Sequence, residues 1–180
     1  MLIMMSGLPG TGKSTLARAL AGRGGGVVLD KDSIRAALFS PAYLEYSQRQ
    51  DDFCQQVMLA ASEYLLSRDR SLRIFLDGRP FSHHYQREQV KDAAARLRTP
   101  LAIIECLCSD AVALARLQAD VESGTHPAAN RNPSLYAQGK ASFEPLSEPR
   151  LTIDTSQPLE TCVRQAESYL ELISRPSARE

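Results

Sequence analysis

A glycine-rich stretch near the start of the chain has the residue types and the spacing to bind phosphate. GLPGTGKST, residues 7–15, fits the pattern G-x-x-x-x-G-K-[ST]. Glycines allow backbone N–H groups to turn inward around a polyphosphate, a lysine reaches the β- and γ-phosphates, and a serine hydroxyl ligates Mg²⁺. The stretch lies between a short apolar run and a helical pattern, as such a loop requires. The predicted nucleotide-binding residues are Gly7, Leu8, Pro9, Gly10, Thr11, Gly12, Lys13, Ser14 and Thr15.

Three acidic residues lie where two predicted strands end. Asp30 ends the run VVLD, Asp32 follows two residues later, and Asp77 ends the run IFLD. The carboxyl ends of parallel strands meet at one edge of a sheet, where ligands bind. Asp77 is placed like a Walker B acid, to hold Mg²⁺ or contact an acceptor, and Asp32 is predicted to orient or deprotonate an acceptor hydroxyl. Because a helix is expected to begin near Asp32 or Ser33, an N-cap is an alternative and compatible role for Asp32.

Basic residues near these acids suggest contacts with the acceptor. Arg35 lies about one turn into the second predicted helix, and Arg79 closely follows the third predicted strand; both are predicted to bind the acceptor, Arg35 through an anionic group. A solvated helix face is the alternative for Arg35 and also for Arg87, since most arginines are exposed. His83 and His84 have no third metal ligand at a recognisable spacing, so we interpret them as polar residues at a helix start.

Strand and helix patterns alternate along the whole chain. The strands are apolar throughout, as is typical of a parallel sheet with helices on both faces, so an α/β fold is predicted. Strands are expected at 2–6, 27–30, 72–77, 101–108 and 150–154. Helices are expected at 13–22, from Asp32 or Ser33 onward, and at 45–67, 83–98, 109–122 and 157–173. We expect one domain over residues 1–174 and a loose tail at 175–180.

Composition narrows the class of partner. The 180 residues carry 21 Lys+Arg and 21 Asp+Glu, so the formal net charge is zero. Proteins that hold long nucleic acids usually carry a positive surplus, which makes nucleic acid the less favoured partner. The apolar run at the start is too short for a signal peptide or a membrane span. The scattered cysteines are interpreted as buried thiols, which predicts a protein of the reducing cytoplasm. No membrane partner is expected, and the oligomeric state is open. The cysteines are Cys54, Cys106, Cys108 and Cys162.

Three stretches, GLPGTGKST, LDKDSIR and FLDGRPF, resemble the small P-loop kinases. This group includes polynucleotide 5'-hydroxyl kinase, shikimate and gluconate kinases, chloramphenicol phosphotransferase, zeta toxins and the AAA_33-type predicted kinases. The resemblance implies a three-layer P-loop NTPase fold, with five parallel strands in the order 2-3-1-4-5 and a small lid at about 116–140. It also implies ATP as the phosphate donor and Mg²⁺ as the metal.

The same resemblance suggests roles for individual residues. Asp30 and Asp32 form a D-x-D pair similar to that of shikimate kinase, which implies that Asp30 serves the metal together with Ser14 and Asp77. The D-x-x-R pair of Asp32 and Arg35 is similar to the base and the acceptor-phosphate ligand of polynucleotide kinase. The later stretches HPAANRNPSLY, FEPL and LTIDTS resemble a subgroup of predicted kinases whose acceptor is poorly defined.

Lid arginines of such kinases cover the phosphates. The resemblance implies Arg116 as the first lid arginine and Arg131 as the second, with ordinary exposed arginines as the alternative. Many relatives place a second arginine one turn after the first, whereas this chain has Asp120 and Glu122 there. The sequence therefore departs from a conventional lid at this point, which directs attention to Arg131.

The leading hypothesis is an ATP-dependent kinase that phosphorylates a hydroxyl of a small molecule such as a sugar, sugar acid, nucleoside or antibiotic. Lys13 and Arg116 would draw charge from the γ-phosphoryl group while Asp32 aligns the hydroxyl. A polynucleotide 5'-hydroxyl kinase is an alternative that the Asp32–Arg35 spacing favours and the neutral charge disfavours. A P-loop NTPase regulated by a partner is a further alternative, for which the D-x-D pair is not needed.

Overall fold

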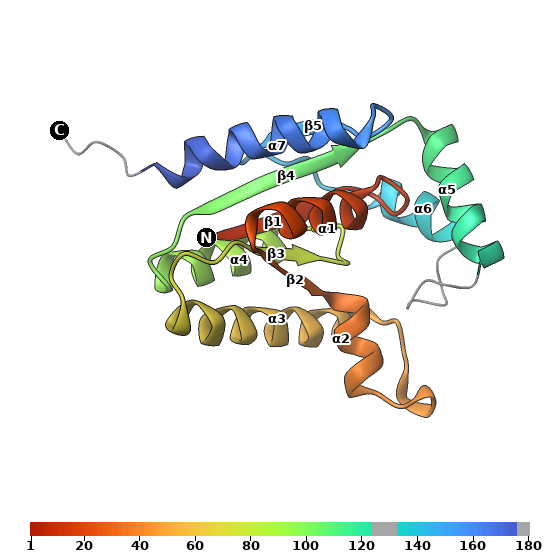
Figure 1. The fold of residues 1–180 in the computed structure, drawn as a ribbon. Coiled ribbons are helices and arrows are strands. Elements are labelled where there is room, and N and C mark those ends of the chain that lie inside the picture. The colour runs from red at the N-terminus through yellow and green to blue at the C-terminus, as the bar shows by residue number, and fades with distance from the viewer. Residues whose placement is uncertain (124–132, 176–180) are drawn as a thin grey trace.

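One parallel sheet organises the protein. A computed structural model describes residues 1–123 and 133–175. Its strands follow the order β2-β3-β1-β4-β5, and each neighbouring pair is parallel (Figure 1). The predicted α/β fold and strand order are therefore confirmed. The strands are β1 (Leu2–Ser6), β2 (Val27–Asp30), β3 (Ile74–Asp77), β4 (Leu101–Leu107) and β5 (Leu151–Asp154).

Helices cover both faces of this sheet and give three layers (Figure 1). They are α1 (Lys13–Gly24), α2 (Lys31–Leu38), α3 (Gln48–Arg68), α4 (His84–Arg96), α5 (Asp110–Ser123), α6 (Pro133–Ala141) and α7 (Leu159–Ser174), with a 3-10 turn η1 (Pro41–Tyr43). Side chains of α1 and α7 share one buried cluster, and side chains of α3 and α4 share another on the opposite face.

The apolar side chains of the central strand β1 pack against the helices on both faces of the sheet. Successive side chains of a strand point to opposite faces. Ile3 and Met5 join the cluster under α1 and α7, and Leu2 and Met4 join the cluster under α3 and α4. All four are fully buried. Each contributes about 1.5–3 kcal/mol on burial, so the uninterrupted apolar run is what a strand covered on both faces requires.

The long helix α3 buries a different stripe from the one that the sequence pattern suggested. The three- and four-residue spacing of apolar residues in 45–67 predicts a buried stripe that includes Phe53 and Tyr64, but these two side chains are exposed. The buried positions are Gln50, Cys54, Gln55, Met58, Ser62 and Leu66. Two stripes at three- and four-residue spacing run along this helix, and packing against the sheet buries the one that contains Cys54, Met58 and Leu66.

The structure also corrects two helix assignments. The second helix begins at Lys31, and Asp30 rather than Asp32 is its N-cap, with the Asp30 carboxylate accepting a hydrogen bond of 2.7 Å from the backbone N–H of Ser33. A helix that the sequence pattern did not predict, α6, occupies Pro133–Ala141 next to α5. Of the predicted tail, only Arg175 falls within the described residues.

In the described part of the chain, no helix is both long enough and apolar enough to span a membrane.

All four cysteines are free; Cys108 is half-buried and the other three are buried. Burial raises the pKa of Cys106 to about 12, so this thiol stays protonated.

Candidate functional site

The glycine-rich loop turns between β1 and α1 at the carboxyl edge of the sheet. Gly7, Gly10 and Gly12 have φ angles of 132°, 78° and 79°, a region that L side chains rarely adopt. A Cβ on Gly7 would lie 2.3 Å from the carbonyl oxygen of Cys106, and one on Gly10 would lie 2.5 Å from that of Ala113. These two glycines are therefore required by the close approach of β4 and α5.

Lys13 is buried within the loop that it follows. Its Nζ donates a hydrogen bond of 2.7 Å to the carbonyl oxygen of Leu8, and the Thr11 hydroxyl donates one of 2.8 Å to the same oxygen. These bonds hold the loop closed around the lysine. A cavity of about 280 Å³ opens here, lined by Gly10, Gly12, Lys13, Ser14, Thr15, Arg18, Arg116 and Asp120. The size of this cavity and the positive charge of Lys13, Arg18 and Arg116 suit the phosphates of a nucleotide.

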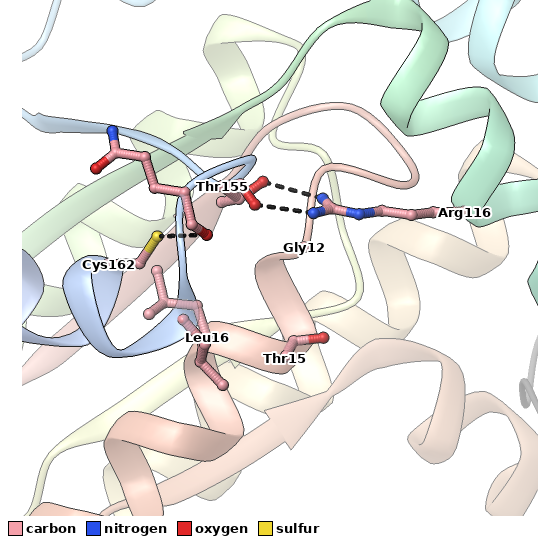
Figure 2. Close-up of a pocket in the computed structure, with 8 residues that line it drawn as sticks. Gly12, Thr15, Leu16, Arg116, Thr155 and Cys162 are labelled. Atoms are coloured by element: carbon pink, nitrogen blue, oxygen red, sulfur yellow. Dashed lines mark hydrogen bonds between the residues drawn. The ribbon is translucent and has the colours of Figure 1, made fainter.

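A second cavity of about 250 Å³ adjoins the first and shares Gly12, Thr15 and Arg116 with it (Figure 2). Its other lining residues are Leu16, Thr155, Gln157, Leu159 and Cys162. Apolar side chains with a few polar groups suit a planar base. No sequence motif predicts a site role for these five residues; the only signal is the stretch LTIDTS, which contains Thr155 and ends just before Gln157.

Arg116 points from α5 toward this second cavity (Figure 2). It donates hydrogen bonds to the carbonyl oxygen of Thr155 (2.8 Å), to the Thr155 hydroxyl (3.1 Å) and to the carbonyl oxygen of Gly10 (3.4 Å). It is therefore not an ordinary solvated arginine. Arg131, the second predicted lid arginine, lies outside the described residues.

Asp77 is the most unusual polar side chain of the site. Its carboxylate is completely buried, and neither oxygen has a hydrogen-bond partner among the residues that the structure describes. It ends β3 directly beside Asp30, which ends β2. An ionised group without partners is costly to bury, so such a group in a folded protein calls for a ligand. Mg²⁺ prefers oxygen ligands, and the carboxylates of Asp77 and of its strand neighbour Asp30 fit that preference. The Ser14 hydroxyl, at the start of α1, offers a further oxygen.

Asp32 belongs to a closed ring of alternating charges. Its Oδ1 lies 2.7 Å from Arg35 Nη1 and 3.2 Å from Lys31 Nζ. The same two cations also contact Asp51 Oδ1, Lys31 at 3.0 Å and Arg35 through Nη2. Burial lowers the pKa of Lys31, and the nearby Arg35 lowers it further. The solvated alternative for Arg35 is wrong, because its side chain is only 2% exposed.

Arg79 forms a second neutral group beside this ring. Its Nη2 lies 2.5 Å from Asp52 Oδ1, and its Nη1 donates a hydrogen bond of 2.9 Å to Gln55. The Tyr85 hydroxyl donates to the same Asp52 oxygen at 2.9 Å. Lys31, Asp32 and Arg35 belong to α2 and Asp51 belongs to α3, so the packing of these two helices completes the ring. The group around Arg79 instead joins the segment after β3 to Asp52 and Gln55 of α3 and to Tyr85 of α4.

Arg87 is structural rather than solvated. Its side chain is buried, pairs with Glu148 at 3.1 Å and donates to the carbonyl oxygen of Phe81 at 3.1 Å. The alternative that Arg87 lies on a solvated helix face is therefore wrong. Sequence reasoning had no signal for Glu148, which comes from the segment before β5.

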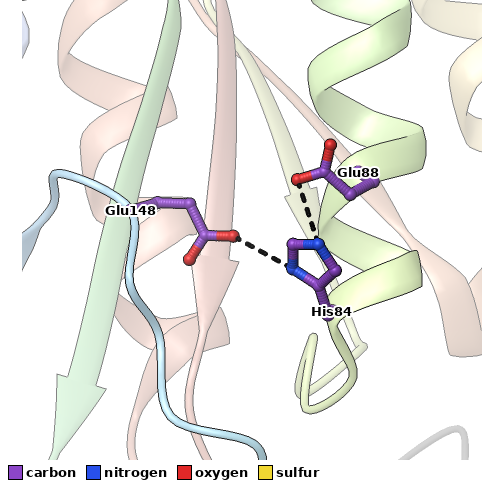
Figure 3. A group of neighbouring side chains, drawn as sticks. All are labelled: His84, Glu88 and Glu148. Atoms are coloured by element: carbon purple, nitrogen blue, oxygen red, sulfur yellow. Dashed lines mark ion pairs between the residues drawn. The ribbon is translucent and has the colours of Figure 1, made fainter.

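The two histidines lie at the start of α4, as interpreted. His83 forms a capping box with Gln86. His84 lies between two carboxylates, with Nε2 3.6 Å from Glu88 and Nδ1 3.9 Å from Glu148 (Figure 3). The fold thus supplies the third side chain that the sequence lacked. Each ring nitrogen faces a different carboxylate, and Glu88 and Glu148 also pair with Lys91 and Arg87.

The sheet order and the glycine-rich loop before α1 define a P-loop nucleotide-binding protein. The model of the AAA_33 family, described as an AAA domain, matches residues 2–146, and the chain belongs to this family. The predicted membership is confirmed. Among curated proteins, none matches the chain.

Solved structures share the whole fold at low sequence identity. Kti12 of Chaetomium thermophilum, in complex with ADP-AlF3, has a TM-score of 0.74 at 15% identity over 98% of this chain and 100% of its own. A gluconokinase from Sinorhizobium meliloti 1021 has a TM-score of 0.67 at 20% identity over 95% and 92%. The APS kinase CysC of Mycobacterium tuberculosis, in complex with AMPPNP and APS, has a TM-score of 0.67 at 16% identity over 94% and 96%. These similarities establish the P-loop kinase fold for this chain.

Proposed function

We propose that this protein transfers the γ-phosphate of ATP to a hydroxyl group of a small molecule. The observation that carries the proposal is the position of Asp32, an acid held at the carboxyl edge of the sheet by Lys31 and Arg35. A nucleotide-binding switch needs the loop but not such an acid. Solved structures that share the fold and hold adenine nucleotides, those of Kti12 and of the APS kinase CysC, support ATP as the donor.

Asp32 keeps one oxygen for the acceptor. Its contacts within the described residues all involve Oδ1, and its side chain is 11% exposed. Oδ2 then accepts the proton of the acceptor hydroxyl as its oxygen attacks the γ-phosphorus. A new P–O bond forms to the acceptor, the bond between the γ-phosphorus and the β–γ bridging oxygen breaks, and ADP leaves.

The nucleotide side supplies positive charge. Lys13 and Arg116 would stabilise the γ-phosphoryl group in the transition state, and the backbone N–H groups of residues 7–15 would hold the phosphates. Asp77, Asp30 and Ser14 would hold Mg²⁺, which when bound neutralises charge on the β- and γ-phosphate oxygens. Residues 116–140 would act as the lid, with Arg131 as its second arginine. Exclusion of water by the lid would prevent hydrolysis.

Arg35 and Arg79 would act on the acceptor indirectly. Their guanidinium groups hold Asp32, Asp51 and Asp52 in place, and each is only 2% exposed. This burial disfavours the polynucleotide kinase alternative, in which Arg35 would have to reach an acceptor phosphate. The alternative of a partner-regulated NTPase requires that the acidic residues be dispensable.

The test is an ATP-consumption screen with Mg²⁺ across sugars, sugar acids, nucleosides, amino alcohols, aminoglycosides and a 5'-hydroxyl oligonucleotide. Lys13→Ala and Asp32→Ala should each lower acceptor-stimulated turnover by at least roughly 100-fold. Asp32→Asn keeps the shape, and Ser33→Ala, at the exposed neighbouring position, is the matched control. A loss below tenfold for Asp32→Ala contradicts its role. Slow hydrolysis that neither an acceptor nor the substitution changes would instead support the partner-regulated NTPase.

A further inference from the structure

The guanidinium of Arg35 is held by two acids and by an aromatic ring. Its Nη1 pairs with Asp32 at 2.7 Å, and its Nη2 pairs with Asp51. The ring of Tyr46 lies under the guanidinium, with 5.1 Å between the ring centroid and the guanidinium carbon. An aromatic face attracts a cation, and it does so more strongly where water is excluded; the Arg35 side chain is only 2% exposed. The ring therefore adds a contact of a different kind to the two ion pairs.

This contact matters because the hydrogen bonds of Arg35 are incomplete. The third nitrogen, Nε, is buried and has no hydrogen-bond partner within residues 1–123 and 133–175. A guanidinium is positioned most firmly when all of its donors are used. With Nε unused, the orientation of the Arg35 guanidinium depends more strongly on the ring of Tyr46.

The backbone of Tyr46 adopts an uncommon conformation where it presents this ring. Its φ angle is 47°, in the left-handed region that residues with a Cβ rarely adopt. Such a conformation costs free energy and persists only where the surrounding structure holds it, and it is frequent at functional sites. Tyr46 lies two residues before α3, in the connection from α2. The strained residue of this connection is thus also the one that contacts the arginine paired with Asp32.

A buried glutamine holds the connection around Tyr46. Gln50 Oε1 accepts a hydrogen bond of 3.1 Å from the backbone N–H of Glu45, and its Nε2 donates one of 2.9 Å to the carbonyl oxygen of Tyr43. The backbone N–H of Gln50 donates to the hydroxyl of Ser47, the N-cap of α3, at 3.2 Å. The residues on both sides of Tyr46 are therefore tied to the first turn of α3, which supplies the support that a left-handed residue needs.

We propose that Tyr46 is a positioning residue: its ring fixes the guanidinium of Arg35, which in turn fixes Oδ1 of Asp32 so that Oδ2 faces the acceptor hydroxyl. This proposal rests on the proposed phosphotransferase function, in which Asp32 aligns that hydroxyl. A group that aligns a nucleophile must be held closely, because small displacements lower the rate of the chemical step. Loss of the ring should therefore lower kcat, whereas ATP, which is proposed to bind along residues 7–15, should bind as before.

Four variants of the full chain separate the ring from the backbone conformation. Tyr46→Phe keeps the ring, and Tyr46→Leu replaces it by an apolar side chain without an aromatic face. Tyr46→Gly has no ring but adopts a φ of 47° without strain. Tyr43→Leu, which changes a side chain that is 72% exposed in the same connection, is the matched control.

The kinetic measurement is ATP turnover with Mg²⁺ and the acceptor of the screen that gives the highest Asp32-dependent rate. We expect Tyr46→Leu and Tyr46→Gly each to lower kcat about tenfold, with less than about a twofold change in the KM for ATP. Tyr46→Phe and Tyr43→Leu should keep kcat within about threefold of wild type. In the Asp32→Asn background, Tyr46→Leu should cause no further loss, because both changes act on the same carboxylate.

An NMR measurement tests the contact without any acceptor. The Nε–Hε signal of Arg35, assigned by its loss in Arg35→Lys, should be displaced by the ring current of Tyr46 from the signals of exposed arginines. The signal should keep its position in Tyr46→Phe and move toward those of exposed arginines in Tyr46→Leu. An Arg35 signal that Tyr46→Leu leaves unchanged would overturn the contact.

The kinetic results can also overturn the positioning role. Full activity of Tyr46→Gly would assign the effect to the backbone, and a further loss in the Asp32→Asn background would show that Tyr46 does not act through Asp32. Either result, together with turnover that Asp32→Asn abolishes, would leave the phosphotransferase function standing. ATP hydrolysis that no acceptor stimulates and that Asp32→Asn does not change would overturn the phosphotransferase function, and the role of Tyr46 with it.

Discussion

The guanidinium of Arg116 donates hydrogen bonds to both the carbonyl oxygen and the hydroxyl oxygen of Thr155, at 2.8 and 3.1 Å. The Thr155 hydroxyl in turn donates to the carbonyl oxygen of Thr11, at 2.8 Å, in the glycine-rich loop. Three distant segments, the loop after β1, helix α5 and the turn after β5, are thus joined by one threonine. Thr155 therefore sets the position of an arginine proposed to act on the phosphates.

Removal of the Thr155 hydroxyl should reduce turnover. Thr155→Val keeps the shape of the side chain and the carbonyl bond with Arg116 but loses the hydroxyl bonds with Arg116 and Thr11. We therefore expect about a tenfold lower kcat/KM for ATP, equivalent to about one net hydrogen bond. Steady-state ATP consumption measures the effect. Thr155→Ser retains the hydroxyl and should keep most of the activity. Equal kinetics in the Val and wild-type proteins would show that Arg116 does not depend on Thr155.

Substitution of Asp77 should have opposite effects on stability and on metal use. Asp77→Asn replaces a buried carboxylate that has no hydrogen-bond partner in the described part of the chain, so the melting temperature in Mg²⁺-free buffer should rise. The same change should weaken Mg²⁺-dependent ATP binding at least roughly tenfold, because a ligand is lost. Thermal unfolding and calorimetric titration measure the two effects. The exposed Asp92→Asn is the control, and a lower melting temperature with unchanged Mg²⁺ dependence would contradict the assignment.

Alanine substitutions of two glycines, Gly7 in the loop and Gly22 in α1, should change the stability of the protein in opposite directions. Gly7→Ala places a Cβ 2.3 Å from the carbonyl oxygen of Cys106 at a φ of 132°, and should destabilise the protein by at least about 2 kcal/mol. Gly22→Ala lies in α1 with nothing within 4 Å of the added Cβ, and should stabilise by about 0.5–1 kcal/mol. Urea unfolding measures both. Similar stabilities for the two variants would contradict the loop geometry.

The contribution of Glu144 to stability should depend on pH. Hydrogen bonds from the backbone N–H of His84 and from the His83 side chain lower the pKa of Glu144 below its usual 4.5. A lowered folded-state pKa stabilises the fold above the unfolded pKa, and this stabilisation disappears as pH falls through the folded pKa. Glu144→Gln should therefore lower the urea midpoint at pH 7, with a smaller difference near pH 3. Glu63→Gln is the control at both pH values.

Much of the fold follows from local patterns in the sequence. Apolar runs such as IFLD predict strands buried on both faces, because a parallel sheet needs helices on each side. The stripe of α3 shows where this reasoning ends. Two stripes of this helix satisfy the same spacing, and only contact with the sheet decides that Met58 and Leu66 are buried while Phe53 and Tyr64 are exposed.

The helix after β2 shows a similar limit. Both Asp30 and Asp32 have the side chain of an N-cap, and the pattern favoured Asp32. Because the chain is still extended at Asp30, that residue takes the cap and Asp32 enters the first turn. Asp32 is thereby left to pair with Arg35.

The sequence by itself determined the phosphate-binding loop, the strand order implied by its family resemblance, and the acids at the strand ends. These features depend on residue type and short spacing, which act locally. The tertiary structure alone decided the partners of those residues. Within residues 1–123 and 133–175, Asp77 is left without a hydrogen-bond partner. Asp51 and Asp52 complete the charged groups around Arg35 and Arg79, and Thr155 orients Arg116. Such contacts join segments far apart in the chain, and their energies depend on burial, which only the packed fold defines.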